Sequence, residues 1–171
     1  MIHRDQDYGS EDRSKKFKEK LESVELAAFL TEPNDIEGYF LNAEHLNFLN
    51  PKVSVIEAQK IIDDCVAATK SKSLEAMVNL RTEQAFRERS SSGKAPDHGK
   101  IATEALADYD KNPKKFCRGD IVIGQVSAEL QKTLGENPTI FEPSQFLKSA
   151  ILTEVSKKIW KPIDPAVANG A

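Results

Sequence analysis

The sequence predicts a mainly α-helical protein, in which a helical bundle-like region follows a small βαβ unit. Two short apolar segments near the N-terminus flank a charged helical stretch, which is the element order of a βαβ unit. From residue 43 onward, apolar residues recur at helical spacings, and there is neither an internal repeat nor a long heptad pattern. We therefore expect a βαβ unit over residues 1–42, a helical domain over residues 43–161 and a disordered tail over residues 162–171.

Length and composition exclude several classes of protein. A chain of 171 residues is long enough for one domain with a substantial core and too short for two full-sized domains. The net charge of -3 argues against a protein that coats nucleic acid through bulk electrostatics, although it leaves room for local basic patches. Two cysteines cannot build a disulfide framework, and there is neither a secretory signal pattern nor an apolar run of membrane-spanning length. We expect a cytoplasmic protein that does not associate with membranes.

Local signals predict the N-terminal elements. Residues 1–4 suit the end of a strand, and Ser10 is a suitable N-cap for the helix that follows it. That helix, over Glu11–Val24, is rich in Lys and Glu and has one narrow apolar stripe, so it should face solvent. The segment Glu25–Thr31 is short, apolar and bounded by Pro33, which favours a second strand.

The remaining elements are predicted as helices. Asp35 suits the N-cap of a short turn through Leu41, and Asn50-Pro51 should end a short helix over Ala43–Leu49. Ser54 should cap the most strongly predicted helix, whose apolar face contains Val55, Ala58, Ile61, Ile62, Cys65 and Val66.

Serines, glycines and prolines predict where the later helices are interrupted. Ser71–Ser73 should interrupt the long helix that begins after Ser54. Ser90–Pro96 should form a flexible linker, and Lys114–Gly119 should form a basic loop. Further helices are expected at Leu74–Arg89, Lys100–Tyr109, Asp120–Leu134 and Pro143–Trp160.

Acidic residues at two places in the sequence predict half of a metal site. Asp5 and Asp7 are carboxylates at i and i+2 directly after a predicted strand, and a turn about thirty residues later carries Glu37. Such hard oxygen ligands are the ones that Mg²⁺ and Mn²⁺ prefer. Solvated surface carboxylates are the alternative interpretation, and Asp35 suits an N-cap better than a metal ligand.

These motifs resemble the second half of a Toprim domain, as found in the overcoming-lysogenisation-defect (OLD) family of ATP-dependent nucleases. The order is Arg4-Asp5-Gln6-Asp7-Tyr8, a charged helix, a short strand and then Asn34-Asp35-Ile36-Glu37-Gly38-Tyr39-Phe40-Leu41. The resemblance implies that Asp5 and Asp7 match the family's acidic pair and that Glu37 matches a later glutamate of the metal site. Gly38 stands where the family often has Asn. The implied function is hydrolysis of nucleic-acid phosphodiesters with Mg²⁺ or Mn²⁺, with DNA as the expected partner of the complete assembly, in the setting of antiphage defence.

The sequence departs from the OLD family in ways that limit what this chain does alone. A Gly-Lys pair often opens a helix after a basic loop in that family, whereas Gly119-Asp120 stands here. The first Toprim strand, which would supply another glutamate, is not found, and neither is a phosphate-binding loop of the form Gly-x-x-x-x-Gly-Lys-Ser/Thr. We expect the chain to carry only part of a nuclease site, to be completed by a partner half or by a second copy, and to hydrolyse no ATP by itself.

A basic cluster gives a second set of candidate residues. Lys114, Lys115 and Arg118 are candidate contacts to a nucleic-acid backbone, and a solvated basic loop explains them equally well. His3, beside the acidic pair, is better explained as an ordinary strand-end residue, and Cys65 as a core residue.

The competing function is a non-catalytic helical interaction module, or a truncated remnant, that docks a partner protein. A βαβ unit without neighbouring strands leaves an unpaired edge on its first strand, and such edges pair readily with another chain.

Overall fold

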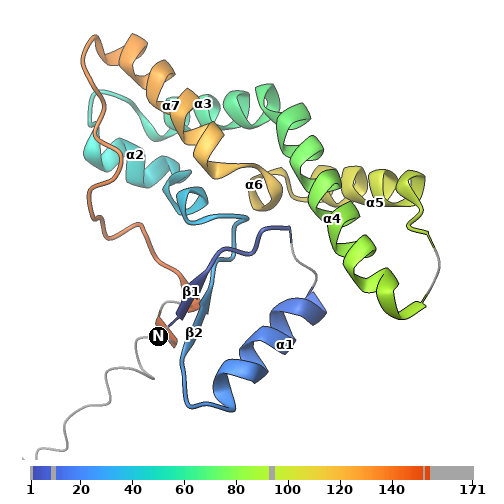
Figure 1. Ribbon diagram of the computed structural model, residues 1–171. Helices are drawn as coiled ribbons and strands as arrows, with labels where there is room; N and C mark the ends of the chain where they lie inside the picture. The colour runs from blue at the N-terminus through green and yellow to red at the C-terminus, as the bar shows by residue number, and fades with distance from the viewer. Residues whose placement is uncertain (1, 9–10, 93–94, 152, 155–171) are drawn as a thin grey trace, which may run out of the picture.

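The computed structural model describes residues 2–8, 11–92, 95–151 and 153–154, and it is mainly α-helical (Figure 1). This confirms the fold class predicted from the sequence. In chain order, the elements are β1 (Ile2–Arg4), α1 (Glu11–Glu22), β2 (Ala28–Leu30), the 3₁₀-helix η1 (Ile36–Phe40), α2 (Ala43–Leu49), α3 (Val55–Ala68), α4 (Lys70–Ser92), α5 (His98–Lys111), α6 (Pro113–Phe116) and α7 (Gly119–Leu134).

The predicted strand, helix and strand form a βαβ unit. β1 and β2 pair in parallel, with Ile2 opposite Ala28 and Arg4 opposite Leu30. α1 packs against β2, and the Arg4 guanidinium lies 5.1 Å from the centre of the Phe17 ring on α1. Because the strands are parallel, both end at the same edge of the sheet.

The main hydrophobic core lies where α3 packs against α2 and α7. Its completely buried side chains include Leu46 of α2, Ile62 of α3, and Val122, Val126 and Leu130 of α7. Each of these side chains contributes about 1.5–3 kcal/mol through removal of its apolar surface from water. The helical region is therefore held together mainly by these three helices.

The helix predicted after Ser54 begins there for the expected reason. Ser54 Oγ accepts a hydrogen bond from the Glu57 amide at 3.2 Å, and the Glu57 carboxylate accepts one from the Ser54 amide at 2.9 Å. This reciprocal pair is a capping box, which satisfies two amide groups that the helix itself leaves unpaired. The buried face of α3 contains Ala58, Ile62, Cys65 and Val66.

The helix break predicted at Ser71–Ser73 exists but lies slightly earlier, because these serines belong to the first turn of α4, which begins at Lys70. The helices separate instead at Thr69, whose hydroxyl donates to the carbonyl oxygen of Cys65 at 2.9 Å. Ser73 is completely buried, and its hydroxyl accepts a hydrogen bond from the Arg118 amide at 3.1 Å. Tertiary packing therefore overrides the local preference of serine for turns.

Two predicted loops are partly helical. Residues 114–116 of the basic loop belong to α6, because Pro113 suits a first helical position and the Asn112 side chain accepts a hydrogen bond from the Lys115 amide at 3.1 Å. The predicted linker Ser90–Pro96 is helical through Ser92, since extending an existing helix costs little. Residues 93–94 of that linker lie outside the described residues.

The prediction of a helix from Pro143 is wrong for residues 143–149. Residues 143–149 are not helical, and helical backbone begins at Ala150. Residues 139–149, which we call the strap, instead run past α2 toward the sheet (Figure 1). The rest of the predicted helix, including Trp160, and the predicted tail lie outside the described residues.

Side chains of α2 and of the residue that follows it hold the strap in place. Asn50 donates to the Thr139 carbonyl at 2.8 Å and accepts from the Thr139 amide at 3.0 Å. The imidazole of His45, which is completely buried, lies 2.7 Å from the Ile140 carbonyl oxygen and 2.8 Å from the Ser144 hydroxyl. These long-range contacts explain why residues 139–149 do not form a helix.

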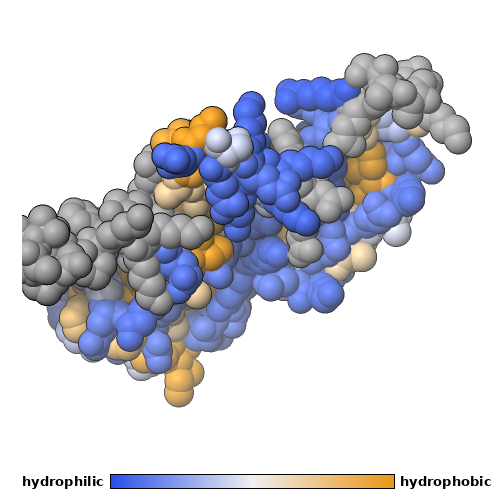
Figure 2. All heavy atoms as spheres, turned by 90° about the horizontal axis from the view of Figure 1, so that it is seen from below, coloured by the Kyte–Doolittle hydropathy of each residue, from blue (hydrophilic) through white to orange (hydrophobic). Residues whose placement is uncertain are grey.

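The face shown in Figure 2 is mostly hydrophilic, with hydrophobic residues in small separate groups. In the part of the chain that the structure describes, no helix is both long enough and apolar enough to cross a membrane.

Candidate functional site

The three predicted metal ligands line one pocket. This pocket, of about 400 Å³, opens near the edge at which both strands end, and we call it the acidic pocket. Ligands of parallel α/β sheets bind outside the carboxyl ends of the strands, because the loops there converge. Its lining residues are Asp5, Asp7, Tyr8, Asn34, Asp35, Glu37, Ala76, Leu80, Arg118 and Asp120.

The loop that carries the aspartate pair is fastened to the loop after β2. The Gln6 amide donates to Thr31 Oγ1 at 3.0 Å, and the Asp7 and Tyr8 amides donate to the backbone and side-chain oxygens of Asn34 at 3.1 and 2.9 Å. Asp7 and Tyr8 both have left-handed backbone conformations, with φ of 46° and 55°. Non-glycine residues keep such conformations only where the surroundings impose them. Asn34 is therefore a positioning residue that the sequence analysis missed.

Asp35 is a helix cap, as predicted, and it caps two helices. Its Oδ1 accepts a hydrogen bond from the Gly38 amide in η1 at 3.1 Å, and its Oδ2 accepts one from the Gly119 amide at the start of α7 at 2.8 Å. Burial raises the pKa of the Asp35 carboxyl, whereas these two amide donors act to lower it. Its oxygens are thus engaged in joining η1 to α7.

Two glycines allow this close approach. A Cβ atom on Gly119 would lie 2.1 Å from Asp35 Oδ1 and 2.5 Å from the Gly38 nitrogen. A Cβ atom on Gly38 would lie 2.4 Å from the Pro33 Cβ. Both glycines therefore stand where η1 is closely packed, and the missing side chain of Gly38 leaves room for Pro33.

A charged pair lies at the same pocket. The guanidinium of Arg118 donates to both carboxylate oxygens of Asp120, through Nε at 3.1 Å and Nη2 at 2.5 Å. Arg118 was predicted to act with Lys114 and Lys115, and its place beside the acidic residues was not predicted. The sequence signal that could have indicated this place is Gly119-Asp120, which follows Arg118 directly and opens a predicted helix.

The acidic pocket is lined by carboxylate oxygens, which are the ligands that divalent cations such as Mg²⁺ prefer. The Asp5 Oδ1 atom is buried without a hydrogen bond and lies 3.4 Å from His3 Nε2, so one acceptor is incompletely satisfied. Among the residues that the structure describes, however, no three His, Cys, Asp or Glu side chains are grouped closely enough to hold a metal ion. Carboxylates that line the pocket would have to turn toward one another to bind one.

The predicted nucleic-acid-binding residues are divided between two places. Arg118 lines the acidic pocket, whereas Lys114 and Lys115 line a neighbouring pocket. The ammonium of Lys114 also lies 3.5 Å from the carboxylate of Asp63 on α3. The basic cluster of the sequence is thus not a single surface.

The two cysteines have structural environments. Cys65 and Cys117 are both free thiols and both buried. Burial raises the pKa of the Cys117 thiol to about 12, so it is protonated at neutral pH and a poor nucleophile.

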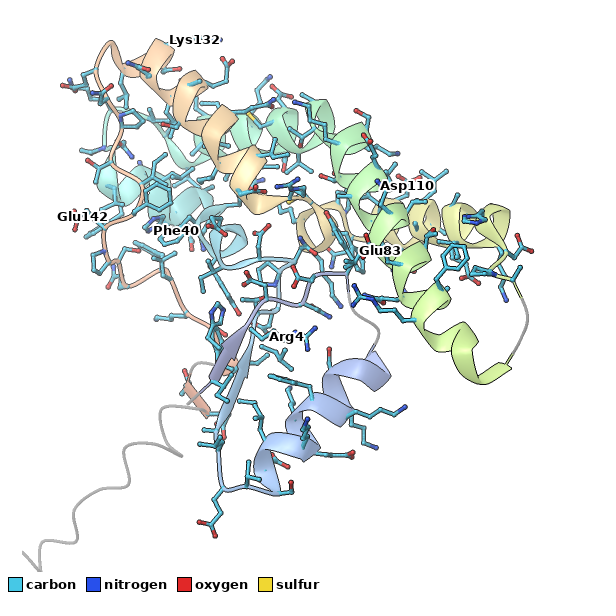
Figure 3. All side chains as sticks on the ribbon, viewed as in Figure 1. Arg4, Phe40, Glu83, Asp110, Lys132 and Glu142 are labelled. Carbon is cyan, nitrogen blue, oxygen red and sulfur yellow. The ribbon has the colours of Figure 1, made fainter. Side chains whose placement is uncertain are left out.

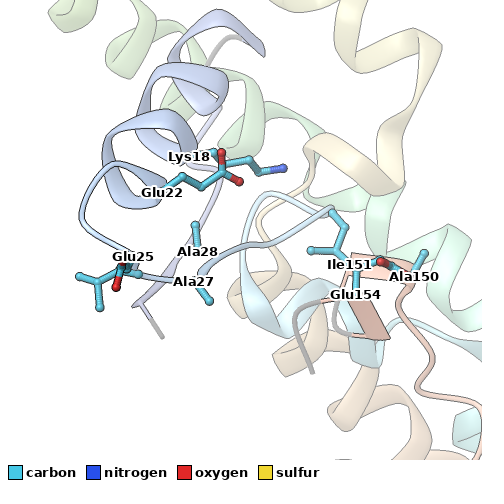
Figure 4. A pocket seen from close by; sticks show the side chains of 9 residues that line it. Lys18, Glu22, Glu25, Ala27, Ala28, Ala150, Ile151 and Glu154 are labelled. Carbon is cyan, nitrogen blue, oxygen red and sulfur yellow. The ribbon is translucent and has the colours of Figure 1, made fainter. Parts of the chain in front are cut away.

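A third pocket, of about 440 Å³, lies where the chain enters β2 (Figure 4). Ala27 and Ala28 face Ala150 and Ile151 across it. Exposed hydrophobic side chains occur nearby in sequence, at Val24 and Leu26. The lining also includes the charged residues Lys18, Glu22, Glu25 and Glu154, so this pocket combines apolar side chains with charged ones.

Comparison of the chain with protein-family models, curated proteins and solved structures finds no match. The acidic pocket and the sequence motifs that line it are therefore the grounds for a functional proposal.

Proposed function

We propose that the acidic pocket binds Mg²⁺ or Mn²⁺ and forms part of a Toprim-type nuclease site that hydrolyses nucleic-acid phosphodiesters. The observation that carries this proposal is that Asp5, Asp7 and Glu37 line one pocket at the carboxyl edge of two parallel strands. These residues come from two segments about thirty residues apart in the sequence, and both segments carry the acidic motifs.

The residues have separate roles in this proposal. Asp5, Asp7 and Glu37 would hold the cation, which when bound neutralises the charge that develops during phosphodiester displacement. Asn34 and Asp35 keep the two acidic loops in register through their hydrogen bonds. The guanidinium of Arg118 is suited to a phosphate oxygen, because its planar donors match oxyanions.

The chain would supply only part of the complete site. Phosphodiester hydrolysis commonly uses two cations about 3.5–4 Å apart, which need more carboxylates than the three that the motifs provide. A further acidic strand would come from a partner half, and DNA is the expected substrate. The OLD resemblance is the reason for this expectation.

Mn²⁺ titration followed by NMR tests the location of the site. A bound paramagnetic ion broadens nearby signals, so amides of residues 5–8 and 34–38 should disappear first. The Asp5→Asn/Asp7→Asn variant should lose this selectivity, and an Asp64→Asn/Asp110→Asn control should keep it, because those residues form exposed ion pairs elsewhere. Uniform broadening of the wild-type chain would contradict the proposal. Plasmid cleavage by the same samples would show whether the partial site is active alone.

A second candidate function is docking of a protein partner at the sheet. The observation that favours it is the exposure of Ile2, Val24 and Leu26, of which Val24 is 60% exposed. Sedimentation of the wild-type chain and of a Val24→Ser/Leu26→Ser variant tests docking of a second copy. A docking surface predicts association that the variant loses, whereas a metal site alone predicts identical monomers.

A further inference from the structure

A second polar pocket, of about 360 Å³, shares η1 with the acidic pocket. Glu37 of η1 lines the acidic pocket, and Tyr39 of η1 lines this second pocket. Lys114 and Lys115 of α6 and Lys148 of the strap also line it, and we call it the basic pocket. We propose that the basic pocket binds a phosphate group of the same nucleic-acid strand that is cleaved at the acidic pocket. This inference rests on the proposed function for the identity of the ligand.

The charges of the basic pocket favour an anion. Three lysines line it against one carboxylate, that of Glu32, which accepts a hydrogen bond from the Ser149 hydroxyl at 3.2 Å. Within the described part of the chain, no carboxylate lies at ion-pair distance from the ammonium of Lys115 or Lys148. The ammonium of Lys115 lies 5.4 Å from the centre of the Phe116 ring, a contact that leaves its charge uncompensated. Two cationic groups thus line one open pocket without a carboxylate partner among the described residues, which creates a local positive potential on an acidic protein.

The backbone around Lys148 is fixed on both sides. The Asn42 side chain donates to the Phe146 carbonyl at 3.3 Å, and the Tyr39 and Ser149 hydroxyls lie 3.4 Å apart. The Lys148 amide donates to the Phe146 carbonyl at 3.0 Å. The backbone of this lysine is therefore held at the pocket before any ligand binds, which reduces the entropy that the strap loses on binding.

The basic pocket is joined directly to the acidic pocket. The amide of Asn34, which lines the acidic pocket, donates to the carbonyl of Lys115 at 3.0 Å. Carboxylates at the acidic pocket would repel a phosphate strand whenever no cation is bound. The lysines of the basic pocket would supply the attraction that these carboxylates cannot, and a ligand with regularly repeated phosphates offers one phosphate to each pocket. A nucleic-acid strand fits these conditions better than a single free phosphate.

Fluorescence anisotropy with a short labelled DNA duplex, in the presence of EDTA, tests this proposal without any metal. The Lys115→Ala and Lys148→Ala variants should each weaken binding by roughly 3- to 10-fold at low salt and reduce the salt slope by about one. Lys132→Ala is the matched control, because this exposed lysine lies near the far end of α7 and pairs with Glu129 (Figure 3). Circular dichroism of each variant confirms that it is folded.

Several outcomes would overturn the proposal. It fails if the wild-type chain does not bind the duplex, if all three lysine variants weaken binding equally, or if inorganic phosphate binds while the duplex does not.

The Asp5→Asn/Asp7→Asn variant separates this inference from the proposed function. In EDTA it should bind the duplex at least as tightly as the wild type, because two repelling charges are removed. Lost metal binding with retained lysine-dependent DNA binding supports both proposals. Lysine-dependent DNA binding by a chain that never binds metal would overturn only the metal site. If the chain binds metal but its DNA binding does not depend on Lys115 and Lys148, only the proposal for the basic pocket is overturned.

Discussion

Gly119 and Asp35 form the contact on which the geometry of the acidic pocket depends. Asp35 joins the start of α7 to η1, and η1 carries Glu37. The contact is possible only because residue 119 has no side chain. The local sequence predicted that Asp35 caps the turn that became η1. It could not predict the hydrogen bond from the Gly119 amide to Asp35, because these two residues are 84 positions apart.

Gly119→Ala should destabilise the protein. The new methyl would overlap Asp35 and the backbone of η1, and overpacking of this kind costs roughly 1–3 kcal/mol. Gly124→Ala is the matched control on the same helix, since a Cβ there meets nothing within 4 Å. It should stabilise by about 0.5–1 kcal/mol, because alanine favours helix over glycine. Urea unfolding measures both, and equal stabilities of the two variants would contradict the close contact.

The raised pKa of Asp35 predicts how its contribution to stability depends on pH. Burial is the largest cause, so the folded state holds the proton more tightly than the unfolded state, in which the pKa has its ordinary value of about 3.8. As pH rises from about 4 through the raised pKa, the folded state therefore loses stability relative to a chain without this carboxyl.

Urea unfolding of the wild type and of Asp35→Asn across this acidic range measures the effect. The free energy of unfolding of the wild type, minus that of the variant, should fall as pH rises and then level off near neutral pH. A difference that rises with pH would show that the two amide donors outweigh burial.

At the scale of elements, local signals correctly predicted the starts of η1 and α3. Asp35 and Ser54 each accept a hydrogen bond from a nearby amide, and such contacts depend only on neighbouring residues. The exact place of the break before α4 and the conformation of residues 143–149 were predicted wrongly, because distant partners decide those segments. Ser73 is buried against the chain before α7, and the strap is held by α2 and Asn50.

Asn50→Ala should release the strap. The variant loses three hydrogen bonds, two to Thr139 and one to the Leu46 carbonyl, which should cost about 2 kcal/mol. Amide hydrogen exchange at residues 139–149 should accelerate more than exchange in α7.

Asn47→Ala is the control for this effect. Its side chain donates to the Val53 carbonyl at 2.7 Å, and no hydrogen bond joins it to the strap in the described structure. It should lower stability without selective exchange in the strap. Unchanged protection of the strap in Asn50→Ala would contradict its role as the main attachment. The Phe40 ring, whose centre lies 5.1 Å from that of Phe141, would then be the stronger attachment (Figure 3).

At the scale of the whole molecule, the acidic pocket lies between the βαβ unit and the helical region. Hydrogen bonds from Asn34 to Lys115 and from Gly119 to Asp35 cross the boundary predicted at residue 42. The sequence motifs selected Asp5, Asp7 and Glu37, which line one pocket. They did not indicate that Arg118 and Asp120 line it too, because only the packing of α7 on η1 brings these residues there.

The measurement that tests the central claim most directly is calorimetric titration of the wild-type chain and of Asp5→Asn/Asp7→Asn with Mn²⁺. We predict saturable binding by the wild type and loss of at least about 10-fold in affinity in the variant, because two of its oxygen ligands become amides, which carry no charge. Unfolding of the wild type, but not of the variant, should also shift to higher temperature with Mn²⁺. Equal titrations of the two folded proteins, or no binding by either, would contradict a metal site in the acidic pocket.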